Sequence, residues 1–150
     1  MAERSIAHTT FTLERTYPVP VPRVFRAWAD PAVKVRWFAG NPEDYEMDFR
    51  PDGIERNQIA HEGKKITWES LYREIVPEQR IVYTSVLSEN DAVATVSLTT
   101  VQFSATGSET SLVLTETGAY LDGRERPEWR EQGTADWLDS LGRHLAENAA

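Results

Sequence analysis

The sequence predicts an α+β fold in which a long amphipathic C-terminal helix packs on a curved antiparallel sheet. Apolar and polar residues alternate with a period of two in several runs between residues 10 and 117, and turn residues separate these runs. A helical apolar stripe follows from residue 137, and it must bury one face against a large surface. The sheet is that surface, so residues 1–150 are expected to form a single domain with one core.

One strand and two short helices are predicted before residue 40. The strand pattern ends at Tyr17, where three closely spaced prolines follow. Asp30 at the N-cap and Pro31 at the first helical position favour the start of the second helix. The predicted buried residues are Val21, Val24, Phe25 and Trp28 in the first helix and Val33, Trp37 and Phe38 in the second.

Six further strands are predicted, which makes about seven in all. The turn sequences Pro51-Asp52-Gly53 and Glu62-Gly63-Lys64 indicate hairpins between neighbouring strands. The mixed alternation between Ile66 and Val76 indicates a β-bulge there. The predicted strands are Tyr45–Phe49, Ile54–His61, Ile66–Val76, Arg80–Leu87, Val93–Ser104 and Thr110–Thr117.

The last helix is predicted to begin near Pro127. Proline suits the first helical turn, and the nearby Glu128 and Glu131 suit the positive end of the helix dipole. Gly133 lies on or beside the apolar stripe, where its missing side chain indicates either tight packing on the sheet or room left for a ligand. The stripe consists of Trp137, Leu138, Leu141 and Leu145.

The composition is that of a folded, acidic protein. The hydrophobic share of 40% argues against disorder, and a net charge of −8 without any basic run argues against a nucleic-acid partner. The absence of cysteine excludes disulfides and suits a reducing compartment, so a cytoplasmic location is expected. The segment Met1–Thr10 does not resemble a signal peptide, and no apolar run is long enough for membrane insertion.

Candidate chemistry is sparse, because the common catalytic and phosphate-binding motifs are absent. His8, His61 and His144 are predicted on separate elements, so neither a metal site nor a cofactor is expected.

Glu116 is the most informative charged residue of the sequence. It shares one face of the last predicted strand with Leu112 and Leu114, which indicates an inward carboxylate with a raised pKa. The alternative is that the strand ends early and Glu116 meets solvent or an arginine. If Glu116 faces inward, its expected neighbours are His61, Trp68, Tyr83 and Tyr120.

Aromatic residues are the other candidates. They are either ordinary core or the lining of a ligand cavity, and spacing alone does not separate the two. They are Trp37, Phe38, Trp68, Trp129 and Trp137.

Four segments carry a recognisable pattern: Val24–Trp28 with Asp30-Pro31 and Arg36–Phe38, Phe49–Gly53, Tyr72–Tyr83, and Leu114–Tyr120. Together they resemble the family named after the C-terminal domain of the activator of Hsp90 ATPase, within the START-like superfamily. The resemblance implies a helix-grip fold, in which the sheet grips the C-terminal helix, often around a hydrophobic cavity.

The leading hypothesis is a protein that binds an apolar or aromatic small molecule between the sheet and the C-terminal helix. One alternative is a cyclase, aromatase or hydrolase that uses Glu116 with His61 or a tyrosine, so catalysis stays open. The other is a chaperone-associated interaction module. This alternative ranks lower because the family's eukaryotic chaperone activator has a preceding domain, whereas one domain is expected here. A homodimer also stays open.

Overall fold

Seven antiparallel strands form one sheet in the computed structural model, which describes residues 4–39 and 42–148. The strand order is β1-β7-β6-β5-β4-β3-β2, so β1 and β2 are the edges. This confirms the predicted α+β, helix-grip architecture. The strands are β1 Ile6–Tyr17, β2 Tyr45–Met47, β3 Ile54–His61, β4 Lys64–Val76, β5 Arg80–Glu89, β6 Ala92–Thr106 and β7 Glu109–Leu121; the helices are α1 Val21–Ala29, α2 Pro31–Trp37, the short 3₁₀ helix η1 Pro42–Asp44 and α3 Pro127–Glu147.

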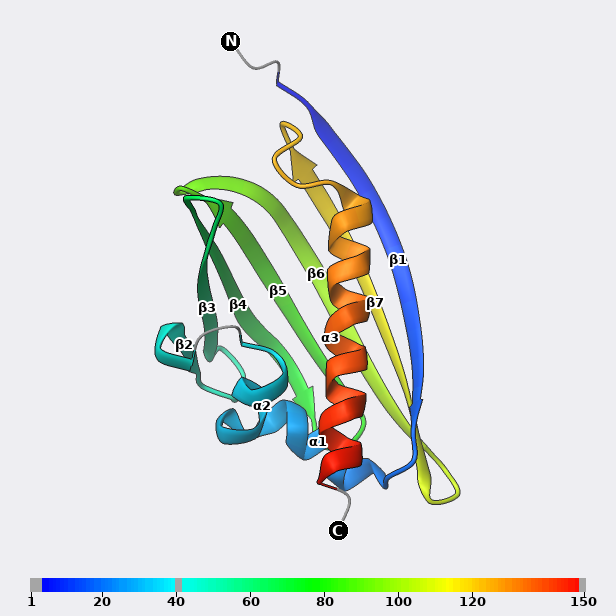
Figure 1. Ribbon diagram of the computed structural model, residues 1–150. Helices are drawn as coiled ribbons and strands as arrows, with labels where there is room; N and C mark the ends of the chain where they lie inside the picture. Colours follow the sequence, from blue (N-terminus) through cyan, green and yellow to red (C-terminus); the bar gives the residue numbers. More distant parts are fainter. Residues whose placement is uncertain (1–3, 40–41, 149–150) are drawn as a thin grey trace.

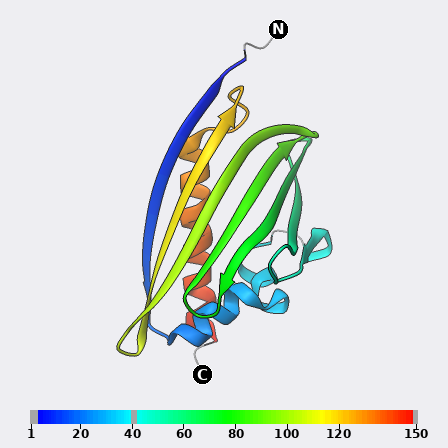
Figure 2. The same cartoon turned by 180° about the vertical axis from the view of Figure 1, so that it is seen from behind.

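The curved sheet and α3 form two layers. The helix lies along the inner face of the sheet, as Figure 1 shows, and the view from behind in Figure 2 shows that none of the described helices covers the outer face. Along β6, the inner residues Thr95, Ser97 and Thr99 are buried, whereas Val96 and Leu98 on the outer face are exposed. The period of two therefore separates a covered face from an open one.

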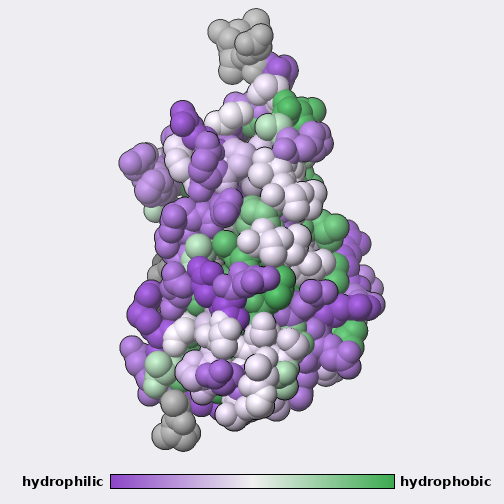
Figure 3. Space-filling model, turned by 90° about the vertical axis from the view of Figure 1, so that its right-hand side faces the viewer, coloured by the Kyte–Doolittle hydropathy of each residue, from purple (hydrophilic) through white to green (hydrophobic). Residues whose placement is uncertain are grey.

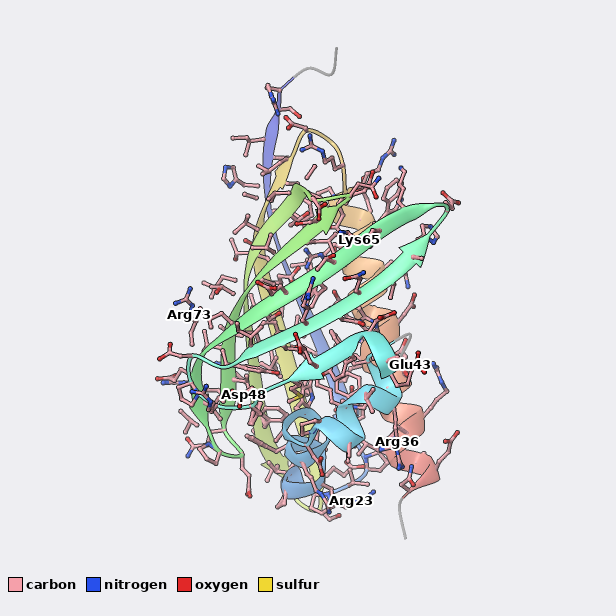
Figure 4. The ribbon with its side chains drawn as sticks, turned by 90° about the vertical axis from the view of Figure 1, so that its left-hand side faces the viewer. Arg23, Arg36, Glu43, Asp48, Lys65 and Arg73 are labelled. Carbon is pink, nitrogen blue, oxygen red and sulfur yellow. The ribbon has the colours of Figure 1, made fainter. Side chains whose placement is uncertain are left out.

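The helices α1 and α2 close the lower end of the sheet in Figure 1, and Arg23 and Arg36 mark them in Figure 4. Proline occupies the first turn of both helices, and the Asp30 side chain accepts a hydrogen bond from the Ala32 amide at 3.0 Å. The Phe25 ring of α1 stacks on Phe103 of β6 with centroids 5.4 Å apart. These contacts fill the lower end with aromatic side chains.

The lower half of α3 is held by apolar packing and by one buried tyrosine. Leu138, Leu141 and Leu145 are almost fully buried, which confirms most of the predicted stripe. The Tyr17 hydroxyl at the end of β1 donates a hydrogen bond of 2.8 Å to the Leu138 carbonyl. A Cβ added at Gly142 would lie 3.3 Å from the Tyr17 ring, so this glycine allows the close approach of helix and strand.

Strand ends differ from the prediction where pairing continues beyond the sequence pattern. β7 extends to Leu121 instead of Thr117, because β1 and β6 pair with it on both sides along this stretch. Tyr120 is therefore a strand residue. The predicted bulge is confirmed by a register shift between Tyr72 and Glu74.

One residue of the predicted stripe in α2, Val33, packs against the core but is only partly buried. Its neighbour Lys34, which the stripe does not include, is buried at 1% exposure. The reason is that Lys34 forms an ion pair with a buried carboxylate of β3 and so occupies the inward position of the helix.

The surface of the described residues combines charged side chains with exposed hydrophobic ones such as Val96, Leu98 and Trp129. Figure 3 shows hydrophilic and intermediate residues over much of one side, with apolar residues between them near its middle. No helix in 4–39 or 42–148 is long and apolar enough to cross a membrane. The single domain over residues 1–150 stays a prediction, and 1–3, 40–41 and 149–150 lie outside the described residues.

Candidate functional site

The space between the lower sheet and α3 is filled by aromatic side chains. The Phe38 and Trp137 rings lie 4.4 Å apart, and Trp68 lies 5.7 Å from Trp137. The cavity that remains measures about 10 Å³, which is barely the size of one water molecule. Its lining includes Trp28, Trp37, Phe38, Trp68, Tyr83, Leu114, Glu116 and Trp137. In this conformation these aromatic residues are core.

Glu116 faces this interior, as its strand period predicts. It is 2% exposed, its Oε1 accepts a hydrogen bond of 2.8 Å from the Thr99 hydroxyl, and its Oε2 lies 3.3 Å from Arg130 Nη1. Burial raises the pKa of the Glu116 carboxyl, while Arg130 and Thr99 oppose the rise. The sequence left open whether Glu116 faces inward or meets an arginine. Both hold, because the buried carboxylate is paired with Arg130.

Arg130 of α3 connects Glu116 to the upper end of the molecule. Its Nε lies 3.2 Å from the Glu125 carboxylate, which also accepts a hydrogen bond of 2.5 Å from the Thr95 hydroxyl. The guanidinium lies 4.5 Å from the centre of the Trp68 ring, a cation–π contact. Arg130 is only 4% exposed, so the upper half of α3 buries a charged group where its lower half buries leucines.

An open cleft is lined by the β3–β4 hairpin, the end of β5, the start of β6, the loop between β7 and α3, and the start of α3. These segments lie at the upper end of the ribbon in Figure 1. The cleft encloses about 750 Å³. Its apolar lining consists of Ile66, Leu87, Ala94 and Trp129, and its polar lining of His61, Glu62, Lys64, Glu89, Asp122, Gly123, Arg124 and Glu125.

Most charges of the cleft are paired with one another. Lys64 lies 3.2 Å from Glu89, and Arg124 lies 3.1 Å from Asp122. Trp129 is 61% exposed, and the Arg126 guanidinium lies 5.2 Å from the centre of its ring. The cleft thus presents the exposed Trp129 ring beside charged side chains that are paired with one another.

A second buried ion pair, between Lys34 and Glu55, is not predicted from the sequence pattern. Lys34 Nζ lies 2.6 Å from Glu55 Oε2, and both side chains are 1% exposed. Tyr45 also donates a hydrogen bond to Glu55, and the ammonium lies 4.5 Å from the Phe38 ring centre. Burial lowers the pKa of Lys34, although Glu55 opposes the decrease. The available signal was that a lysine and a glutamate occupy inward-facing positions of a helix and a strand.

The structure distributes the predicted site residues over two regions. Trp37, Phe38, Trp68, Tyr83, Glu116 and Trp137 line the packed interior, whereas His61 and Trp129 line the open cleft. The expectation that His61 neighbours Glu116 is therefore wrong, because His61 lies at the exposed end of β3. Among 4–39 and 42–148, no three histidine or acidic side chains are grouped as metal ligands.

Tyr120 and Gly133 belong to the lining of neither region. Tyr120 is 2% exposed, and burial raises its pKa to about 12, so its hydroxyl is protonated at neutral pH. A Cβ added at Gly133 meets no atom within 4 Å, which rules out tight packing on the sheet at this position.

Comparison with known proteins agrees with this architecture. Residues 18–146 match the family described as activator of Hsp90 ATPase homolog 1-like protein. The chain belongs to this family. No curated protein matches it.

Solved structures support the same assignment. An uncharacterized protein from Rhizobium leguminosarum is 40% identical, with 97% of this chain and 99% of that one covered and a TM-score of 0.92. The Mll3558 protein from Rhizobium loti is 38% identical, with 94% and 99% covered and a TM-score of 0.89. CalU16 from Micromonospora echinospora, at 20% identity, 99% and 88% coverage and a TM-score of 0.66, shares the fold.

Proposed function

We propose that this protein binds an apolar small molecule in the cleft between the upper end of the sheet and the start of α3. The observation that carries the proposal is the volume of about 750 Å³, within the range of roughly 300 to 1,000 Å³ that encloses small ligands. The remaining interior space of about 10 Å³ is far too small for such a molecule. The ligand site therefore lies at the mouth of the helix-grip fold.

Trp129 is the main apolar anchor of the proposed site. An indole that is 61% exposed offers a large rigid surface at little cost in conformational entropy, and Ile66 and Leu87 extend this apolar surface. The charged rim is internally paired, so a ligand need not supply a counter-charge.

A binding measurement on two matched variants tests this function. Trp129→Ala is expected to weaken uptake of a neutral environment-sensitive dye such as Nile red by about tenfold, as for an aromatic anchor. Leu98→Ala, which truncates an exposed apolar residue on the outer face, is the control and should bind like wild type. Native mass spectrometry beside a denatured sample asks whether a small molecule copurifies. Failure of wild type to bind the dye, or equal binding by both variants, would contradict the proposal.

The alternatives from the sequence have less support. Glu116 is enclosed by Thr99 and Arg130, and His61 lines a different region, so a Glu116–His61 catalytic pair is not favoured. The chaperone-associated role stays a prediction, which a pull-down with an Hsp90-type chaperone would test.

A further inference from the structure

We propose that a second pocket, at the opposite end of the molecule from the cleft, binds a small phosphate monoester with an apolar substituent. The pocket encloses about 290 Å³ between α1, α2 and the end of α3, which meet at the lower end of the ribbon in Figure 1. Three arginines line it: Arg23 and Arg26 of α1 and Arg36 of α2. Figure 4 labels two of them, Arg23 and Arg36. The site is separate from the cleft, and its ligand is of a different chemical class.

The charge of this pocket is opposite to that of the whole chain. The protein has a net charge of −8, yet the described lining contains three arginines and no acidic side chain. Asp30 is not a lining residue but lies 3.7 Å from Arg26, so it offsets one of the positive charges. Two positive charges remain, which is close to the charge of a phosphate monoester at neutral pH.

The guanidinium groups have donors available for such a ligand. Arg36 is exposed and forms no hydrogen bond or ion pair with any residue that the structure describes. Arg23 donates one hydrogen bond to the Asn148 carbonyl, which engages only one of its five N–H groups. The same bond places a positive group at the negative end of the α3 dipole, which would otherwise repel an anion. Planar guanidinium groups bind phosphate oxygens in pairs.

The lining also has an apolar part, to which all three helices contribute. Ala27 and Leu145 are buried, whereas Val33 is only partly buried and is the most accessible of the three. Inorganic phosphate would contact the arginines alone, while an ester would also cover Val33 and the aliphatic stems of the arginines. The volume lies near the lower end of the range of roughly 300 to 1,000 Å³ that encloses small ligands, so the substituent must be small.

Four compounds test the inference by calorimetric titration of wild type: phenyl phosphate, methyl phosphate, benzoate and benzyl alcohol. Phenyl phosphate is expected to bind about tenfold more tightly than benzoate, because its second charge and third oxygen reach a second guanidinium. Benzyl alcohol, which has no charge, should bind most weakly. Methyl phosphate should bind more weakly than phenyl phosphate, because it covers less of the apolar lining.

Two matched arginine variants show whether the basic lining causes the preference. Arg36→Gln should weaken phenyl phosphate binding about tenfold and leave benzyl alcohol binding unchanged. The fold should be retained, because Arg36 has no polar partner among the described residues. Arg73→Gln makes the same change of charge at an exposed position of β4, away from the pocket in Figure 4, and should bind like wild type.

A third variant and amide chemical shifts separate this site from the cleft. Trp129→Ala should leave phenyl phosphate binding unchanged, because Trp129 lines the cleft. Phenyl phosphate is expected to shift the amide resonances of residues 23–36 and 144–148, which include the pocket lining, and not those of residues 61–66.

Several outcomes would overturn the inference while the binding of an apolar molecule in the cleft stands on its own dye measurement. They are shifts confined to the cleft, benzoate binding as tightly as phenyl phosphate, and equal binding by Arg36→Gln and Arg73→Gln. Absence of saturable phenyl phosphate binding by wild type would overturn it as well.

Discussion

At the scale of single residues, the protein buries two charged pairs beside aromatic rings. Lys34 and Glu55 are each 1% exposed and contact one another at 2.6 Å. Removing one partner of a buried pair leaves an uncompensated charge, whereas removing both can be nearly neutral. α2 must therefore pack on β3 in a position that brings the Lys34 ammonium to the Glu55 carboxylate.

Lys34→Met is expected to lower the free energy of unfolding by about 3 to 5 kcal/mol, because Glu55 then stays buried without its partner. The double variant Lys34→Met with Glu55→Gln should recover much of this loss. Urea denaturation of the two variants and wild type measures both effects. A double variant no more stable than Lys34→Met alone would show that the damage comes from packing and not from charge.

Arg130→Gln is expected to raise the pKa of Glu116 further, because the arginine opposes the effect of burial on this carboxyl. Carbon-13 NMR titration of the carboxyl group measures the shift, and Thr99→Val should move the pKa in the same direction.

The pH dependence of stability has a definite sign at Glu116. Its folded-state pKa lies above its ordinary value of 4.5, so the folded state binds the proton more tightly than the unfolded state. The contribution of Glu116 to stability is therefore complete at low pH and decreases as the pH rises through the folded-state pKa. In Glu116→Gln this decrease should be absent.

At the scale of elements, α3 has two different halves and two glycines with different surroundings. Gly142 faces the Tyr17 ring, which is fixed by its hydrogen bond to Leu138, while nothing lies within 4 Å of a Cβ at Gly133. Equal changes at the two positions should therefore have unequal effects.

Gly133→Ala is expected to raise the free energy of unfolding by about 1 kcal/mol through helix propensity alone. Gly142→Ala should instead lower it, because the new methyl group crowds a ring that cannot move away. Thermal and urea denaturation compare the two variants directly. A similar gain in both would mean that Tyr17 does not hold the helix against β1.

Leu141→Asp tests the grip of the sheet on α3 more severely. Leu141 is fully buried, so an unpaired charge there should cost more than about 4 kcal/mol and leave little folded protein. Ala146→Asp, at an exposed position of the same helix, is the control for the added charge. Thermal melting that barely changes in Leu141→Asp would contradict the packing of α3.

At the scale of the whole molecule, the two ends differ in what holds them. The lower end buries leucines and aromatic rings, while the upper end relies on the ion pairs of Arg130 around an open cleft. Local opening is easier where few apolar contacts must separate. The cleft end is therefore the adaptable end of the fold.

Hydrogen–deuterium exchange should reveal this gradient. Amides of residues 130–135 are expected to exchange faster than those of residues 138–145 within the same helix, and a bound ligand should slow the former set selectively. Uniform protection along α3, or a ligand effect at its lower end, would contradict this division of the molecule.

The sequence by itself determined the strands, the helices and the direction in which many side chains point. Leu141 and Glu116 were predicted to face inward from a helical stripe and a strand alternation, and both are buried. The bulge near Tyr72 was predicted in the same way. Such features follow from local periodicity, because the backbone geometry of a helix or strand fixes which residues share a face.

Only the tertiary structure decided which residues of different elements come into contact and where space remains between them. The partners Arg130 for Glu116 and Glu55 for Lys34 depend on where a helix lies along a strand from another part of the chain. The same placement fills the interior to about 10 Å³ and puts the open cleft near Trp129. Period and propensity describe one element at a time, whereas cavities and ion pairs are set by the distance and angle between elements.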